Sequence, residues 1–346
     1  MTKEELIEQF NPNDPGSSDA GIFGLPFTCE QSDLVLVPVP WEATVSYREG
    51  AALGPAAILD ASYQVDLHHY DYPNLWKRGI ALDDLPGKLG LLSKRAREQA
   101  TQIIEALEQG ARPQENPEMV QRYELVAEAC GQMNRWVEER TSFWLDQGKK
   151  VGLIGGDHSS PLGYYRALAK RHDDFGMLVI DAHMDLRNAY EGFKYSHASI
   201  FYNALQIPQL SQMVQVGIRD YCSEEVDFAK SQGERIAVYY DRLIQREMMR
   251  GVTWHQLVEY IIAKLPKKVF VSVDIDGLDA SLCPNTGTPV PGGLQFEQLA
   301  YLLFRLGECG KEIIGFDLCE VAPGQDDWDG NVGARVLYQL CGMLLK

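Results

Sequence analysis

The sequence has 346 residues, of which 45% are hydrophobic and 10% aromatic, enough to bury the core of one large domain or two smaller ones. It carries 32 Lys and Arg residues against 49 Asp and Glu residues, a net charge of −17. This acidic balance argues against nucleic acid or an anionic membrane as a partner, because both are bound by basic surfaces.

The cysteine pattern and the N-terminal sequence favour a cytoplasmic protein. Seven cysteines are scattered with no CxxC spacing, which is typical of reduced thiols. The first residues have no basic segment followed by an apolar one, so no signal peptide is expected. The sequence contains no run of about 18 consecutive apolar residues, so no membrane span is expected.

The first 90 residues predict few regular elements. Residues 1–30 are expected to form an N-terminal arm, with a short helix over 4–9 followed by coil rich in Pro, Gly and Ser. The apolar run 33–40 predicts the first buried strand, and segment 47–62 predicts a loop that leads into a helix. Residues 63–90 have an irregular pattern with one strand near 79–85.

From residue 91 the sequence predicts helices and then a regular alternation with strands. Helical periodicity over 91–148 is interrupted by two prolines in ARPQENPEM, which predicts two helices joined by a turn. Strands are expected at 151–155, 177–181, 213–218, 235–240, 269–276 and 312–318, and helices from about 161 and around 253–265, 295–308 and 331–345. Val- and Ile-rich strands that alternate with helices are typical of a parallel sheet covered on both faces.

The predicted fold is therefore a single three-layer α/β/α domain over 31–346 with a mainly parallel sheet. The helical segment 91–150 is a candidate insertion into this domain, because strands are expected on both sides of it.

Four of the predicted strands end in acidic or imidazole side chains. Asp181, His183 and Asp185 alternate, so along a strand all three face the same way. The ligand site of an open α/β sheet lies beyond the carboxyl ends of its strands, so four such ends predict one shared site. The polar residues at these ends are Asp157 and His158, then Asp181, His183 and Asp185, then Asp274, Asp276 and Asp279, and finally Asp317 and Glu320.

A metal site explains this pattern most simply, because polar groups on one face of a buried strand are costly unless something binds them. Alone, a strand-end Asp could instead cap the following helix, and His158 could be a core histidine in a turn. Two imidazoles and several carboxylates without a thiolate favour Mn²⁺, with Ni²⁺, Co²⁺, Fe²⁺ or Zn²⁺ as alternatives. The candidates outnumber the ligands of one ion, which indicates a pair of divalent metals that would activate water for hydrolysis.

Several blocks of the sequence resemble the signature blocks of the ureohydrolase (arginase/agmatinase) family, in the family's order. These blocks are GGDHSS, DAHMD, SVDIDGLDASLCPNTGTPVPGG and EVAPG, and SYREGAALGPAAIL is similar to an agmatinase-like block. The resemblance runs from about residue 33 to the C-terminus and is weakest over 91–150. It implies an arginase-like fold, a metal site at the carboxyl ends of the strands, and a homo-oligomer that is a trimer or a hexamer.

The resemblance also implies a role for each site residue. One metal would take His158, Asp181, Asp185 and Asp274, and the other would take Asp181, His183, Asp274 and Asp276. Asp185 would also hydrogen-bond the bridging hydroxide and handle its proton. His197 resembles the family's proton-shuttling histidine, and Glu320 matches the glutamate that holds the substrate guanidinium.

The residues after the metal motif depart from the agmatinase pattern. Arg187 and Asn188 stand just after Asp185 in the run DLRN, and the DLR of this run is more similar to formimidoylglutamases, which generally lack a histidine like His197. An arginine in the pocket would repel a cationic tail and attract a carboxylate. Alternatively Arg187 pairs with an acidic neighbour and touches no substrate, which we favour. Two further pocket candidates are Asp220, expected at the mouth, and Trp328, expected to close over it.

The expected function is hydrolysis of a small cationic guanidino compound with release of urea, catalysed by two divalent metal ions. Agmatine is the first choice of substrate, and formimidoylglutamate, a guanidino acid, arginine and free guanidine are the alternatives. A ureohydrolase-like subunit kept for assembly or regulation is the non-enzymatic alternative. Such a subunit is expected to lose ligands, whereas all six ligand positions are occupied here.

Overall fold

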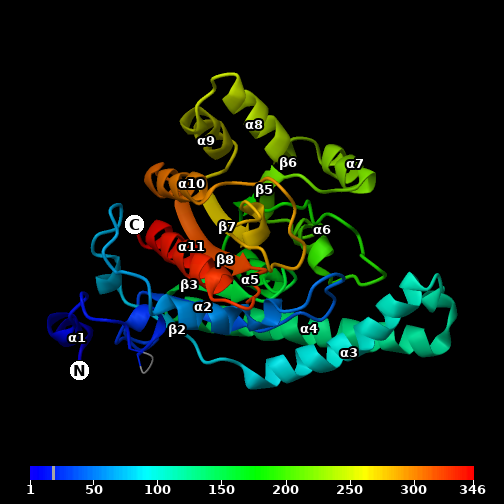
Figure 1. Ribbon diagram of the computed structural model, residues 1–346, viewed down its shortest axis with the longest axis horizontal. Helices are drawn as coiled ribbons and strands as arrows, with labels where there is room; N and C mark the ends of the chain where they lie inside the picture. The colour runs from blue at the N-terminus through cyan, green and yellow to red at the C-terminus, as the bar shows by residue number, and fades with distance from the viewer. Residues whose placement is uncertain (18–19) are drawn as a thin grey trace.

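The structure is a computed structural model that describes residues 1–17 and 20–346, so positions 18 and 19 of the predicted arm lie outside it. A parallel β-sheet forms its centre (Figure 1). The described residues form eight strands in the order β2-β1-β3-β8-β7-β4-β5-β6, and every neighbouring pair is parallel. The strands are β1 (Leu34–Val39), β2 (Ile80–Leu82), β3 (Lys150–Gly155), β4 (Phe175–Ile180), β5 (Leu210–Ile218), β6 (Ile236–Tyr240), β7 (Lys268–Asp274) and β8 (Glu312–Cys319).

The strand order brings the four polar strand ends together. The chain places β1 to β3 in one half of the sheet and β4 to β6 in the other, and β7 and β8 then fill the gap between the halves. Such a change in direction leaves a crevice outside the carboxyl ends of the central strands. Because β3, β8, β7 and β4 are consecutive neighbours, the residues that follow them lie at one edge of the sheet.

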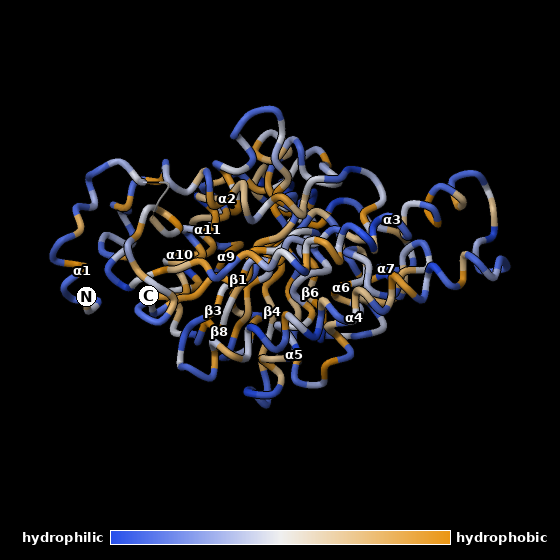
Figure 2. Tube along the Cα trace, turned by 90° about the horizontal axis from the view of Figure 1, so that it is seen from below, coloured by the Kyte–Doolittle hydropathy of each residue, from blue (hydrophilic) through white to orange (hydrophobic). Residues whose placement is uncertain are grey.

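Helices cover both faces of the sheet (Figure 1). Leu34 and Leu36 of β1 belong to one hydrophobic cluster, and Val35 and Val37 belong to another, as expected for a strand buried on both faces. The first cluster includes residues of α2 (Gly54–Ser62), α8 (Asp241–Met249), α9 (Trp254–Ala263), α10 (Phe296–Glu308) and α11 (Trp328–Leu345). The second includes residues of α3 (Gly87–Glu108), α4 (Pro117–Asp146), α5 (Leu162–Ala169), α6 (Ile200–Ala204) and α7 (Ser223–Ser231). Figure 2 shows hydrophobic segments gathered in the sheet and hydrophilic ones along the outer loops.

The segment 91–150 forms the predicted pair of helices. Pro117 is the first residue of α4, where a missing N–H costs no helical bond, and the Asn116 side chain accepts a hydrogen bond from Glu118 N. The far end of this α3–α4 hairpin extends beyond the sheet in Figures 1 and 2. The strands on either side of the segment belong to the same sheet. Whether the hairpin is an insertion stays a prediction.

The N-terminal segment is less exposed than an arm would be. The short helix α1 (Lys3–Gln9) is present, but Ile22, Phe23, Leu25 and Phe27 are buried in the first hydrophobic cluster. This apolar stretch supplies core side chains, which is why it packs instead of extending into solvent. The other predicted strands and helices are confirmed, whereas the short helices α6, α7 and α8 had not been predicted. Within the described residues, no helix is long and apolar enough to cross a membrane.

A buried carboxylate joins the α3–α4 hairpin to the sheet and yields a test of this packing. Asp83 follows β2 and accepts two hydrogen bonds from the Arg140 guanidinium and one from Trp144 Nε1, at 2.8 Å. Asp83→Ala leaves these α4 donors without their partner, so we expect the free energy of unfolding to fall by about 2–4 kcal/mol in urea denaturation.

The matched control is Asp84→Ala, because Asp84 is the exposed neighbour and its loss removes the same charge. We expect this variant to stay within about 0.5 kcal/mol of the parent protein. Equal losses in the two variants would contradict the role given to the buried contacts.

Candidate active site

Several of the polar residues predicted at the strand ends meet around His158, whereas Asp279 instead accepts hydrogen bonds from Ser281 and Gln295. His158 follows β3, and its Nδ1 lies 3.1 Å from Asp181 Oδ2, 3.2 Å from Asp274 Oδ2 and 3.6 Å from Asp185 Oδ2. Asp181 and Asp185 follow β4, and Asp274 is the last residue of β7. Three strand ends therefore place one imidazole nitrogen among three carboxylates.

A second group of the same kind surrounds His183. Its Nδ1 lies 3.1 Å from Asp276 Oδ2 and 3.6 Å from Asp181 Oδ1. His158, Asp181 and Asp185 form one set whose ligand atoms are close enough to share a metal ion, and Asp181, His183 and Asp276 form another. Asp181 belongs to both sets, so the two candidate metal positions are adjacent.

Backbone hydrogen bonds orient three of the carboxylates. Asp181 Oδ1 accepts from His183 N at 2.6 Å, Asp274 Oδ1 accepts from Asp276 N at 2.8 Å, and Asp276 Oδ1 accepts from Ala182 N at 3.0 Å. In each case Oδ1 is fixed by the main chain while Oδ2 faces an imidazole. Because the main chain that binds the Oδ1 atoms lies at strand ends, the sheet also sets the positions of the Oδ2 atoms that face the imidazoles.

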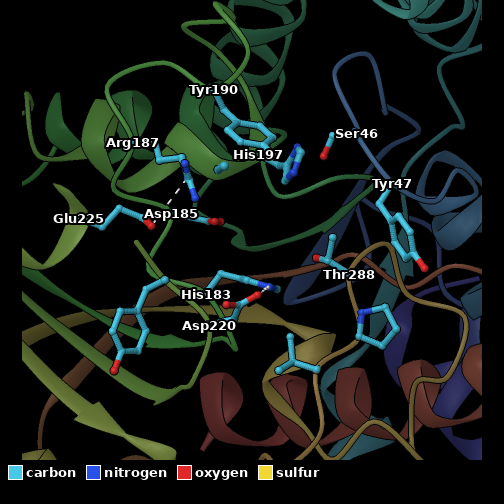
Figure 3. Close-up of a pocket in the computed structure, with 14 residues that line it drawn as sticks. Ser46, Tyr47, His183, Asp185, Arg187, Tyr190, His197, Asp220, Glu225 and Thr288 are labelled. Atoms are coloured by element: carbon cyan, nitrogen blue, oxygen red, sulfur yellow. Dashed lines mark ion pairs between the residues drawn. The ribbon is translucent and has the colours of Figure 1, made fainter. Parts of the chain in front are cut away.

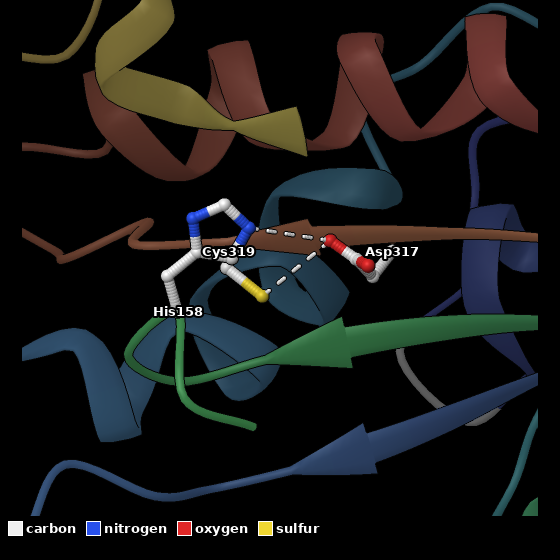
Figure 4. A group of neighbouring side chains, drawn as sticks. All are labelled: His158, Asp317 and Cys319. Atoms are coloured by element: carbon white, nitrogen blue, oxygen red, sulfur yellow. Dashed lines mark hydrogen bonds and ion pairs between the residues drawn. The ribbon is translucent and has the colours of Figure 1, made fainter. Parts of the chain in front are cut away.

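The hydrogen-bond partners of His158 fix its tautomer. Ser272 Oγ donates to Asp317 Oδ1 at 2.9 Å, so its only proton is used, and His158 Nε2, at 3.0 Å, must donate to Ser272 Oγ. A neutral His158 then carries its lone pair on Nδ1, the atom that faces the carboxylates. Tyr165 donates to the other oxygen of Asp317, at 2.9 Å. Figure 4 shows His158 beside Asp317 and Cys319, whose thiol lies 3.8 Å from Asp317 Oδ1.

Two buried atoms of the cluster lack a hydrogen-bond partner among the described residues. They are His158 Nδ1 and Asp181 Oδ2, and both face the space between the carboxylates. With His158 neutral, both atoms are acceptors and cannot bond each other across the 3.1 Å that separates them; two facing buried acceptors are costly in a folded protein, but they are what a metal ion needs. The donor set of imidazole nitrogen and carboxylate oxygen therefore fits divalent metals of the Mn²⁺ to Zn²⁺ series.

The electrostatics of the cluster also favour a cation. Burial raises the pKa of Asp185 well above its usual value, and the neighbouring Asp181 raises it further. Burial and the neighbouring Asp276 do the same to the pKa of Asp274. Burial alone would lower the pKa of His158, but the carboxylates of Asp181 and Asp274 raise it well above its usual value. The site therefore stabilises added positive charge, which a bound metal supplies.

A pocket of about 290 Å³ opens beside the cluster (Figure 3). His183 and Asp185 form part of its wall, so a molecule in the pocket would lie against the candidate metal positions. His197 also lines it, from a short helical turn after the β4 loop. Burial, together with the imidazoles of His183 and His158, lowers the pKa of His197 to about 4. This imidazole is therefore neutral near pH 7 and a weak base, and its protonated form is a strong acid.

Glu320 lies beneath the cluster and not in the pocket wall. It directly follows β8, is 6% exposed, and its Oε1 accepts a hydrogen bond from His158 N at 2.8 Å. Burial, with Asp274 and Asp157 nearby, raises its pKa well above the usual value. The backbone φ of Glu320 is 64° and that of Asp185 is 51°, a region that costs energy for a side chain with a Cβ. Strained backbone conformations cluster at functional sites, so their presence at these two candidate catalytic positions fits a catalytic role.

Of the remaining predicted pocket residues, two line the pocket and two lie outside its lining. Arg187 and Asp220 line the pocket, and Arg187 Nε lies 3.7 Å from Glu225 Oε2, an ion pair of the kind that the sequence analysis favoured. Asn188 is exposed and does not line it. Trp328 is 46% exposed, and its Nε1 donates to Ser281 O at 3.0 Å, outside the pocket lining.

Sequence analysis missed several residues of the pocket wall. Glu225, Tyr190, Tyr47 and Thr288 line it but carry no ligand pattern in the sequence. For Glu225 the only local signal is its position in the first turn of α7, where it forms a capping box with Cys222. Its place in the pocket follows from the tertiary fold, which sequence spacing does not reveal.

The parallel sheet and the cluster of candidate metal ligands at the carboxyl ends of its strands place the protein among α/β metallohydrolase-like folds. The chain belongs to the arginase family, whose model matches residues 32–342. It is thus a hydrolase of carbon–nitrogen bonds in guanidino compounds.

Individual relatives agree with this assignment. The chain is 31% identical over 314 residues to N(1)-aminopropylagmatine ureohydrolase of Thermus thermophilus, which covers 91% of both chains. It is 28% identical to proclavaminate amidinohydrolase of Streptomyces clavuligerus, over 89% of this chain and 88% of that protein. The crystal structure of agmatine ureohydrolase of Thermoplasma volcanium matches the fold with a TM-score of 0.71 and 23% identity, covering 99% of this chain and 97% of that one.

The hydrogen bond between His158 and Ser272 can be tested by metal binding. Ser272→Ala removes the acceptor that directs the Nδ1 lone pair into the cluster, so we expect divalent metal affinity to fall about 10–100-fold, measured by equilibrium dialysis against Mn²⁺. The control is Ser62→Ala, since Ser62 is a buried serine remote from the cluster that bonds Phe23 N and Leu59 O. Unchanged affinity in Ser272→Ala would contradict this tautomer argument.

Proposed function

We propose that the protein is a binuclear ureohydrolase that converts agmatine and water to putrescine and urea. Mn²⁺ is the proposed metal, with Ni²⁺ as the alternative. The observation that carries the proposal is the pair of imidazole–carboxylate sets that share Asp181 and contribute His183 and Asp185 to the wall of a pocket. Relatives named for aminopropylagmatine and agmatine hydrolysis support the choice of substrate.

The cluster has enough ligands for two divalent ions. His158, Asp181, Asp185 and Asp274 would hold one, and Asp181, His183, Asp274 and Asp276 would hold the other. When bound, such a pair lowers the pKa of water and supplies hydroxide near neutral pH. Asp185 both lines the pocket and belongs to the cluster, so its carboxylate is suited to orient this nucleophile.

Glu320 and His197 are the proposed partners of the substrate. Glu320 does not line the pocket, but its carboxyl lies next to His158, and the positive charge of bound metal ions would favour its ionised form, which binds a planar guanidinium strongly and would hold it over the nucleophile. His197 lines the pocket, and its low pKa makes its protonated form a strong acid, suited to deliver to the leaving amine the proton that the attacking water gives up. The amine leaves as an ammonium ion and the guanidinium carbon becomes urea, which conserves the single positive charge.

The pocket wall contains groups for two kinds of substrate tail. Asp220 is an exposed carboxylate at 4.0 Å from His183 Nε2 and suits the ammonium group of agmatine. Arg187 favours the second candidate, a guanidino acid, since its guanidinium could bind a carboxylate. A relative named guanidinobutyrase, from Pseudomonas aeruginosa, is 33% identical over 222 residues, 61% of this chain. The pairing of Arg187 with Glu225 makes agmatine our first choice.

The proposed setting is a homo-oligomer, trimeric or hexameric, in the cytoplasm. All seven cysteines are free thiols, which supports a reducing compartment. Leu91 of α3 and Leu125 of α4 are 61% and 49% exposed, and large apolar side chains of this kind often lie in subunit interfaces. We expect sedimentation velocity at micromolar concentration to give an assembly, and a strictly monomeric species would contradict this proposal.

Substitutions of Glu320 and His197 separate substrate handling from metal binding. Glu320→Gln keeps an oxygen for the hydrogen bond from His158 N but removes the charge facing the guanidinium, and should lower urea release from agmatine about 100-fold. His197→Ala removes proton delivery, should cost roughly 10²–10⁴-fold in rate, and should be partly rescued by added imidazole. Metal analysis should still find about two ions per chain in both variants.

The contrasting variant is Asp274→Ala, which removes a proposed bridging ligand. We expect it to lose at least one metal ion together with activity. Full metal content and activity in Asp274→Ala would contradict the binuclear site, whereas wild-type turnover in Glu320→Gln and His197→Ala would contradict only the roles of these two residues.

A further inference from the structure

Arg187 and Glu225 form an ion pair in the pocket wall. We propose that Glu225 is a positioning residue that neutralises Arg187 and thereby selects a substrate with a cationic tail over one with a carboxylate tail. The inference rests on the proposed function, because it concerns the specificity of that same site.

Glu225 is held rigidly where it meets Arg187. It is 3% exposed, its Oε1 accepts from Leu186 N at 3.1 Å, and its Oε2 accepts from Cys222 N at 3.0 Å. These bonds join α7 to the loop after β4 that carries Asp185 and Arg187. A buried carboxylate that accepts from two backbone donors keeps its position, so the group beside Arg187 is held in place.

Arg187 approaches this carboxylate most closely through Nε, at 3.7 Å, while its guanidinium lies over the Tyr190 ring with Cζ 4.8 Å from the centroid. The side chain is 35% exposed and lines the pocket, where Figure 3 shows it pointing toward Glu225. A guanidinium that stacks on an aromatic ring and pairs through one edge still presents its remaining N–H groups to the pocket. Its positive charge would act on a substrate tail if Glu225 were not there.

The other charges of the pocket wall give the direction of selection. Besides His183, a proposed metal ligand, and His197, which is neutral near pH 7, the carboxylates and cationic side chains among its described residues are Asp185, Arg187, Asp220 and Glu225. Asp185 belongs to the metal cluster, and the charges of Arg187 and Glu225 oppose each other. The uncompensated charge that can act on the tail of a bound substrate is that of Asp220, whose side chain is 68% exposed. The wall as built therefore attracts a cation, and the same wall without the charge of Glu225 would not.

The test compares two substrates of similar length in four variants. Urea release is measured for agmatine, whose tail is an ammonium group, and for 4-guanidinobutyrate, whose tail is a carboxylate. The readout is the ratio of kcat/KM for the two compounds, because damage to the loop lowers both values and leaves the ratio unchanged. The variants are Glu225→Gln, Arg187→Gln, the double variant, and Glu224→Gln as the matched control, since Glu224 is the exposed neighbour on α7.

We expect the wild-type enzyme to prefer agmatine. Glu225→Gln should shift the ratio toward 4-guanidinobutyrate by on the order of 100-fold, about tenfold from each substrate. The double variant should return the ratio to within about threefold of the wild type, and Glu224→Gln should leave it unchanged. Arg187→Gln keeps both backbone bonds of Glu225 and should shift the ratio further toward agmatine, which provides a test should Glu225→Gln fail to fold.

The outcomes separate this inference from the proposed function. If the wild type releases urea from neither compound, the proposed function fails and the inference fails with it. If the wild type hydrolyses them but prefers 4-guanidinobutyrate, or if neither Glu225→Gln nor Arg187→Gln moves the ratio, the ureohydrolase activity stands and the role of Glu225 is wrong. Failure of the double variant to restore the ratio would mean that Glu225 acts through the loop and not through Arg187.

Discussion

Mutual repulsion of buried carboxylates is the constraint on which the rest of the structure depends. Asp181, Asp185, Asp274 and Asp276 are all at most 5% exposed and lie around two imidazoles. No packing gain comes from gathering like charges in a low-dielectric interior, so the fold must hold them together against their repulsion. It does so with the most rigid groups available, which are the backbone N–H donors at the ends of parallel strands.

The strand order is what makes this arrangement possible. Because β7 and β8 are inserted between β3 and β4, residues from distant parts of the sequence become neighbours across a few ångströms. The register of β7 and β8 also pairs Ser272 with Asp317 directly, beneath His158. A single structural feature, the switch point of the sheet, therefore positions both the ligand atoms and the groups that orient them.

The sequence predicted the cluster well because its signal is local. Ligand-type residues at period two after apolar runs are visible without any knowledge of the fold, and strand alternation with helices is equally clear. The pocket wall is different. Glu225 lies in the first turn of a nine-residue helix that periodicity did not detect, and its partner Leu186 N is 39 residues away in sequence. Trp328 was expected to close over the pocket, yet its indole bonds Ser281 O outside the pocket.

The backbone at Asp185 and Glu320 shows how the fold keeps strained residues in place. Asp185 has a φ of 51°, and its carbonyl oxygen accepts hydrogen bonds from Phe201 N at 3.1 Å and Tyr202 N at 3.3 Å. Glu320 has a φ of 64°, donates from N to Gly156 O at 2.8 Å, and accepts from Thr286 Oγ1 at 2.8 Å. Each strained conformation is thus secured by bonds to a different segment of the chain. Because these bonds come from the scaffold and not from a ligand, the two carboxylates are positioned before any substrate arrives, which is the preorganisation that a hydrolytic site requires.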